Sequence, residues 1–161
     1  MRAGSFITIA ALALVQGAPT PDYTYAKQKL SAGGVCRTTT WSGATSDKSP
    51  TIDDCTALRN QLLQAKAQGY VINGFDKDKK NDGTYLGLVS QGTCNFAVQV
   101  FDGKEGIPVI TNSDIADLLR DAMSKFGANG HVGASGQVPC NEDWVVFPKR
   151  IISWKIFAYG E

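Results

Sequence analysis

The chain has 161 residues, of which 43% are hydrophobic and 9% aromatic, and sixteen basic against fifteen acidic side chains give a formal net charge of +1. The apolar content excludes an intrinsically disordered chain, and near-neutrality argues against binding nucleic acid or anionic lipid by bulk electrostatics. The length fits one domain with its own core.

Residues 1–17 have the pattern of a secretory signal peptide, with a basic start at Arg2, an apolar run over 6–15 and small residues after it. A bilayer span needs about twenty apolar residues, so this run predicts no stable membrane insertion. We expect cleavage at Gly17 and a secreted, extracellular product. Because Arg2 is the only charge lost, fifteen basic and fifteen acidic residues would remain. The alternative is a buried N-terminal helix.

Residues 18–33 are polar and contain prolines and glycines, which predicts a flexible lead or a short pro-segment. Residues 34–161 are expected to form the domain. Within it, the threonine-rich segment 35–41 predicts a strand, and the Ser, Gly, Asp and Pro residues of 42–50 predict a loop.

An amphipathic helix is predicted after this loop, because apolar residues recur at steps of three and four. The stripe consists of Ile52, Cys55, Leu58, Leu62 and Ala65. Thr51 or Asp53 can cap the helix, and the helix dipole favours Asp53 and Asp54 in its first turn. We expect Gly69 to end it.

Strands are predicted over residues 70–75, 85–90 and 93–102, with a tight turn at Gln91–Gly92 between the last two. A short extended piece at 107–110 follows, weakened by a proline. These short connections do not suit a doubly wound parallel fold.

A second amphipathic helix is predicted to begin at Asn112 or Ser113 and to end at Gly127. Asp114 and Asp117 favour its start. Its apolar stripe consists of Ile115, Leu118, Leu119, Ala122 and Phe126.

Closing strands are predicted over 131–138, 145–147 and 151–159. In the last of them, alternation places Ile152, Trp154, Ile156 and Ala158 on one face. Two amphipathic helices and several short strands predict an α+β fold, in which the helices cover one face of a mainly antiparallel sheet.

Four cysteines lie in the part that remains after cleavage, namely Cys36, Cys55, Cys94 and Cys140. An even number in a secreted chain favours two disulfides; a zinc site is disfavoured because no Cys-x-x-Cys occurs and there is one histidine. Cys55 points inward from its helix, and Cys94 shares with Phe96 the face that the helices should cover. We therefore hypothesise a Cys55–Cys94 bridge, which leaves Cys36–Cys140.

No catalytic, cofactor-binding or metal-binding residue is assigned from the sequence. The histidine, His131, follows a helix-ending turn, and Ser135 lacks the Gly-x-Ser-x-Gly spacing of a nucleophile elbow. The charged loop 76–83 departs from the calcium-loop pattern. Spacing alone leaves a glycosidase-like carboxylate pair open. Lys149–Arg150 is either a dibasic processing site or an ordinary charged turn.

Several short motifs follow one another along the chain. They are Asp54-Cys55 with Leu58, Gly92-Thr93-Cys94-Asn95-Phe96, Asn112-Ser113-Asp114-Ile115-Ala116-Asp117-Leu118-Leu119, Phe126-Gly127, and Val132-Gly133-Ala134-Ser135-Gly136 leading to Cys140. This order resembles the secreted effectors of filamentous ascomycetes known as extracellular-protein-two effectors or necrosis-inducing factors. The resemblance implies a small, cysteine-stabilised extracellular protein associated with virulence or necrosis, and it transfers no catalytic residue. The pattern also resembles, at the level of the fold alone, the killer toxin of smut fungi.

Three functions are compatible with these features. The preferred one is a non-enzymatic effector that binds a host or competitor extracellular protein, glycan or membrane component, and not nucleic acid. The alternatives are a small secreted hydrolase acting on cell-wall glycan and a killer-toxin-like antimicrobial protein. The aromatic residues beyond the last cysteine either complete a strand or form an exposed partner surface; these are Trp144, Trp154, Phe157 and Tyr159.

Overall fold

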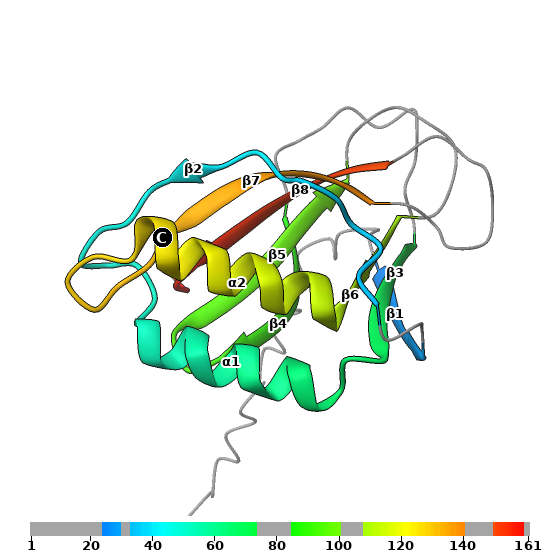
Figure 1. The fold of residues 1–161 in the computed structure, drawn as a ribbon, viewed down its shortest axis with the longest axis horizontal. Coiled ribbons are helices and arrows are strands. Elements are labelled where there is room, and N and C mark those ends of the chain that lie inside the picture. Colours follow the sequence, from blue (N-terminus) through cyan, green and yellow to red (C-terminus); the bar gives the residue numbers. More distant parts are fainter. Residues whose placement is uncertain (1–23, 30–32, 74–84, 101–107, 141–149, 160–161) are drawn as a thin grey trace, which may run out of the picture.

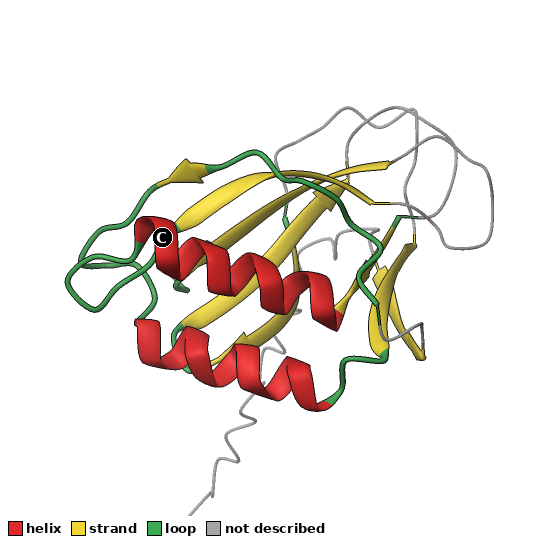
Figure 2. Cartoon of the chain, in the orientation of Figure 1, coloured by secondary structure: helices red, strands yellow, loops and turns green. Residues whose placement is uncertain are grey.

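A computed structural model describes residues 24–29, 33–73, 85–100, 108–140 and 150–159. The elements described are two helices and two antiparallel sheets, and the helices lie side by side across the larger sheet (Figures 1 and 2). The predicted α+β fold is therefore confirmed. The predicted signal peptide, the charged loop 76–83, the strand over 145–147 and Lys149 lie outside the described residues.

The larger sheet has five strands in the order β2-β7-β8-β5-β4, and the smaller has three in the order β1-β3-β6. The larger one contains β2 (Ser42–Gly43), β7 (Ala134–Cys140), β8 (Arg150–Phe157), β5 (Cys94–Val100) and β4 (Leu86–Gln91). The smaller one contains β1 (Thr24–Lys29), β3 (Gln68–Asn73) and β6 (Val109–Thr111).

The helices are α1 (Ile52–Gln64) and α2 (Asn112–Phe126). Thr51 caps α1, as one of the two predicted alternatives. The predicted cap of α2 is wrong, because Thr111 takes that position and its hydroxyl accepts the Asp114 N–H. The predicted stop of α1 at Gly69 is also wrong. The helix ends earlier because the Gln68 N–H donates to the Ala65 carbonyl at 2.9 Å and closes a turn into β3.

Two further segments differ from the sequence-based expectation. Residues 24–29, expected within a flexible lead, form edge strand β1, which pairs with β3. An edge strand tolerates polar and charged side chains, and that composition concealed it. Residues 35–41 form no regular strand beside β7. There the Gln137 N–H donates to the Thr40 hydroxyl at 2.9 Å, so a side chain replaces a backbone acceptor.

The core lies between the helices and the larger sheet, with Trp154 of β8 fully buried in it. Its ring stacks on Phe96 at 6.2 Å and meets Trp41 edge-on at 5.1 Å. Its Nε1–H donates to the Thr39 hydroxyl at 2.8 Å. Of the aromatic residues near the C-terminal end, this one is therefore a core residue, whereas Tyr159 is 77% exposed; Trp144 lies outside the described residues.

Candidate functional site

An aspartate at the third position of helix α1 ties this helix to the larger sheet. The Asp54 carboxylate accepts hydrogen bonds from the Thr93 N–H at 2.8 Å and from its hydroxyl at 2.6 Å. The Thr51 N–H donates in turn to the Thr93 hydroxyl oxygen at 3.0 Å. The next residue of each segment forms a disulfide, Cys55–Cys94. We call Asp54, Thr93 and Thr51 the α1 clamp.

The same position of α2 carries Asp114, which holds a segment distant in sequence. Its carboxylate accepts hydrogen bonds from the N–H groups of Val35 at 3.1 Å and Cys36 at 3.0 Å. It also accepts from the N–H and the hydroxyl of Thr111, at 3.0 and 2.6 Å. Cys36 is bonded to Cys140. We call these contacts the α2 clamp.

Both disulfides have the hypothesised pairing, and each joins parts of the chain that other contacts bring together. Cys36–Cys140 bridges residues 104 positions apart, and Cys55–Cys94 bridges residues 39 positions apart. Cys55, Cys94 and Cys140 are buried. The two bridges and the two clamps thus fix the start of each helix to its surroundings.

Hydrogen bonds from the side chain and backbone of Thr93, followed by one involving Thr51, lower the pKa of Asp54 below its ordinary value of 3.8. The folded state therefore favours the carboxylate. That contribution to stability is present above the unfolded-state pKa and is lost as pH falls through the lower folded-state value.

We predict a pH-dependent effect of the substitution Asp54→Asn, which retains one acceptor oxygen but no charge. At neutral pH the variant should melt at a lower temperature than the wild type, and this difference should shrink as pH falls below about 4. Thermal denaturation followed by circular dichroism from pH 3 to 7 measures it. The exposed neighbour Asp53→Asn is the matched control. A melting difference that stays constant down to pH 3 would contradict the prediction.

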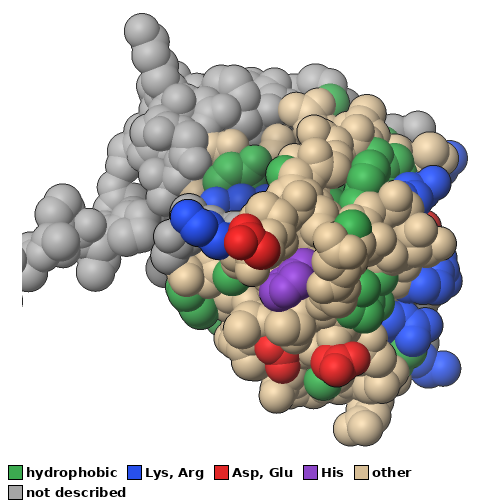
Figure 3. Space-filling model, turned by 90° about the vertical axis from the view of Figure 1, so that its left-hand side faces the viewer, with side chains coloured by type: hydrophobic (Ala, Val, Ile, Leu, Met, Phe, Trp, Pro, Cys, Tyr) green, Lys and Arg blue, Asp and Glu red, His purple; other side chains and the backbone are tan. Residues whose placement is uncertain are grey.

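Among the described residues, no hydrogen bond or ion pair joins His131 to Ser135 or to a carboxylate. The ring Nδ1 of His131 lies 2.7 Å from the Ser49 carbonyl oxygen, a contact that orients the ring. Figure 3 shows this histidine in the middle of one face, with acidic side chains above and below it. Within the described ranges, no group of three His, Cys, Asp or Glu could hold a metal ion. Asp54 and Asp114 are engaged in the clamps.

A groove of about 320 Å³ runs between α2 and the segment 36–41. Its charged groups include Arg120, which forms 2.8 Å ion pairs with Asp117 and Asp121. The hydrogen bond to Asp121 is the largest cause that raises the pKa of Arg120. These side chains are largely exposed, so such pairs contribute little stability. The lining of this groove contains two arginines and three aspartates, so it carries charges of both signs.

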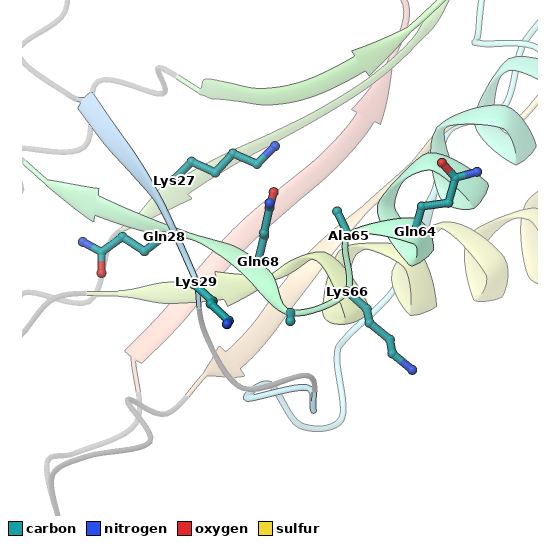
Figure 4. A pocket seen from close by; sticks show the side chains of 8 residues that line it. Lys27, Gln28, Lys29, Gln64, Ala65, Lys66 and Gln68 are labelled. Carbon is teal, nitrogen blue, oxygen red and sulfur yellow. The ribbon is translucent and has the colours of Figure 1, made fainter.

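A second pocket, of about 620 Å³, lies where strand β1 passes the end of α1 (Figure 4). Its charged residues are all lysines, Lys27, Lys29 and Lys66, and the other polar ones are Gln28, Gln64 and Gln68. None of the described residues that line it carries a carboxylate. The sequence did not reveal this pocket, because its first half belongs to the segment that was expected to be a flexible lead.

The outer face of the larger sheet carries a small aromatic cluster. The Lys155 ammonium lies 4.6 Å from the centre of the Tyr85 ring and 4.3 Å from that of Phe157. Phe157 meets Tyr159 edge-on at 6.0 Å. Trp154 and Phe157 thus belong to a strand, which is one of the two alternatives given for the C-terminal aromatic residues, and Tyr159 beyond it is exposed.

The part of the chain that contains these motifs matches a known protein family. Residues 35–140 match the family model Hce2, described as "Pathogen effector; putative necrosis-inducing factor". The chain belongs to this family. The match begins one residue before Cys36 and ends at Cys140, so it covers both disulfides and both clamps of this Hce2 domain.

A curated relative is the protein named "Probable chitinase LysM18" from Penicillium expansum. It is 30% identical over 109 residues, which are 67% of this chain and 7% of that protein. The Hce2 chain therefore spans a small part of its relative. None of the described helices is long and apolar enough to cross a membrane.

Proposed function

We propose that this Hce2 protein is a secreted effector of the necrosis-inducing type, which acts by binding a target outside the cell and not by catalysis. The family match over the whole disulfide-bonded unit carries the proposal. The expected signal peptide and the two disulfides are consistent with an oxidising, extracellular setting.

The contacts of the family motifs support binding as the mode of action. Asp54 and Thr93 hold α1, and Asp114 holds the segment at Cys36. The carboxylates of Asp54 and Asp114 therefore stabilise the fold. Motif residues with such roles leave the exposed surfaces to recognise a partner.

Infiltration of the purified, disulfide-intact protein into leaf tissue tests the proposal. We expect necrosis with the oxidised protein and none with protein that has been reduced and alkylated, because the binding surface depends on the fold. Circular dichroism verifies the state of each sample. Absence of necrosis with the oxidised protein at every concentration would contradict the proposal.

A second candidate, hydrolysis of cell-wall glycan, is favoured by the chitinase name of the Penicillium expansum relative. The comparison covers 7% of that protein, so its named activity can reside in another part. Incubation of the Hce2 protein with chitin oligosaccharides and other wall glycans, followed by product chromatography, separates the two candidates. Turnover above that of a heat-inactivated sample would show that the protein acts by catalysis, against the proposal of binding alone. Inhibition of competing fungi would support the killer-toxin-like alternative.

A further inference from the structure

The lysine pocket concentrates positive charge at one place on a chain that is close to neutral overall. Lys27 and Lys29 come from edge strand β1, and Lys66 comes from the connection between α1 and β3. In Figure 4, Lys27 and Lys29 leave β1 on the side of Gln68 and Lys66, whereas Gln28 leaves it on the other side. The pocket thus lies between strand β1 and the end of α1 with the connection to β3, and both sides contribute lysines.

These three lysines have no ion-pair partner among the described residues, unlike Arg120 in the groove beside α2. Each of them is exposed. The three like charges line one pocket, and an anion that binds there would face three cations. The charge pattern is thus complementary to a ligand with several negative charges.

Strand geometry arranges two of these lysines in a row with an aromatic ring. Tyr25, Lys27 and Lys29 alternate along β1, so they share one face at a spacing of about 6.6 Å. Tyr25 is 40% exposed, and its ring packs edge-on against Tyr70 at 5.3 Å. Burial is the larger cause that raises the pKa of Tyr70 to about 12, so this supporting ring stays neutral. The row offers one apolar ring face beside two cations.

We infer that the lysine pocket binds an acidic polysaccharide whose sugar units carry carboxylates. The ammonium groups would pair with carboxylates, and the glutamine amides would bond to sugar hydroxyls. Tyr25 lies beside the pocket and not in its lining, and it would pack on a sugar ring of a chain that extends along β1. This inference rests on the proposed function, because it names the class of target that an extracellular binder would recognise.

The lining residues favour a glycan over a phospholipid surface. The apolar residues of the lining are Ala65 and Ala67, which provide no side chain large enough to insert among lipid chains. The cations are lysines, whereas planar, two-pronged recognition of phosphate is typical of arginine. Glutamines suit a ligand that is rich in hydroxyl groups.

Fluorescence anisotropy with labelled oligogalacturonate tests the inference on the full-length, oxidised protein. We expect binding by the wild type that weakens with added salt. The variant K27Q/K29Q/K66Q should bind about tenfold more weakly, because it loses three exposed ion pairs. The variant K27R/K29R/K66R keeps the charges and should retain binding to within about threefold.

The matched control is R37Q/K48Q/K125Q, which loses the same number of charges from exposed residues away from the pocket. We expect its affinity to change less than about twofold. Equal weakening in both Gln variants would overturn the inference, because it would show attraction by net charge alone. Absence of wild-type binding, or equal binding of the fully methyl-esterified oligomer, would overturn it as well.

Vesicles of phosphatidylserine and neutral chitin oligomers are the competing ligands. Preference for either over oligogalacturonate would overturn the inference. The leaf assay separates this outcome from failure of the proposed function: wild-type protein that causes necrosis without binding the acidic glycan has the proposed function and another target. Circular dichroism of the three variants verifies that their fold is unchanged.

Discussion

Removal of the Cys36–Cys140 disulfide by replacing both cysteines with alanine is expected to lower the free energy of unfolding by about 4–5 kcal/mol. The bridge closes a loop between residues 104 positions apart, so its loss frees a long stretch of the unfolded chain. In the chain-entropy account, this loss exceeds that expected for the Cys55–Cys94 disulfide, because the entropy that a bridge removes from the unfolded chain rises with the length of the loop it closes.

Urea denaturation followed by tryptophan fluorescence, to which the buried Trp154 contributes, measures this loss. The matched variant lacks Cys55–Cys94, which joins residues 39 positions apart, and should lose about 4 kcal/mol. A loss of less than about 2 kcal/mol on removal of the Cys36–Cys140 bridge would contradict this account of the fold.

The second large effect is expected for Asp114→Ala, with a loss of about 3–5 kcal/mol in the free energy of unfolding. This change leaves the N–H groups of Val35, Cys36 and Thr111 without their carboxylate acceptor. A buried donor without a partner costs about 1–3 kcal/mol. Because Val35 and Asp114 are buried, water cannot fully replace the lost bonds.

The conservative variant Asp114→Asn retains one side-chain oxygen and should lose about half as much. Asp117→Ala is the control on the same helix, since this side chain is 62% exposed and pairs with Arg120 at the surface. It should change stability by no more than about 1 kcal/mol. Equal losses at Asp114 and Asp117 in urea denaturation would show that the α2 clamp contributes no special stability.

Much of the fold could be predicted from local patterns. The stripe along α2 placed Ile115 and Leu119 in the core, and alternation along β8 placed Ile152 and Trp154 there. The same reasoning about faces led to the Cys55–Cys94 pairing, because two inward-facing cysteines on packed elements can meet. Periodicity is informative where burial on one face repeats regularly.

The clamps could not be predicted in that way. Asp114 was assigned to a favourable interaction with the helix dipole, yet its carboxylate also binds Val35, 79 positions away. Only the tertiary arrangement brings that N–H to the start of α2. Strand β1 was missed for a related reason: its lysines lie at a sheet edge, where no apolar alternation is required.

The candidate site was also only partly predictable. The family motifs were recognised from the sequence, but not the structural role of Asp54 and Thr93 within them. The lysine pocket joins Lys27 to Lys66, residues that lie on different elements and belong to no motif. Its composition becomes meaningful only when the fold brings these side chains together.

The most direct test of binding without catalysis is leaf infiltration with a variant that lacks four candidate acid–base side chains outside the clamps. The variant D53N/D117N/D121N/H131Q leaves both clamps and both disulfides intact. At equal concentration, and with an unchanged circular dichroism spectrum, it should cause the same necrosis as the wild-type protein. Loss of necrosis in this folded variant would contradict the account.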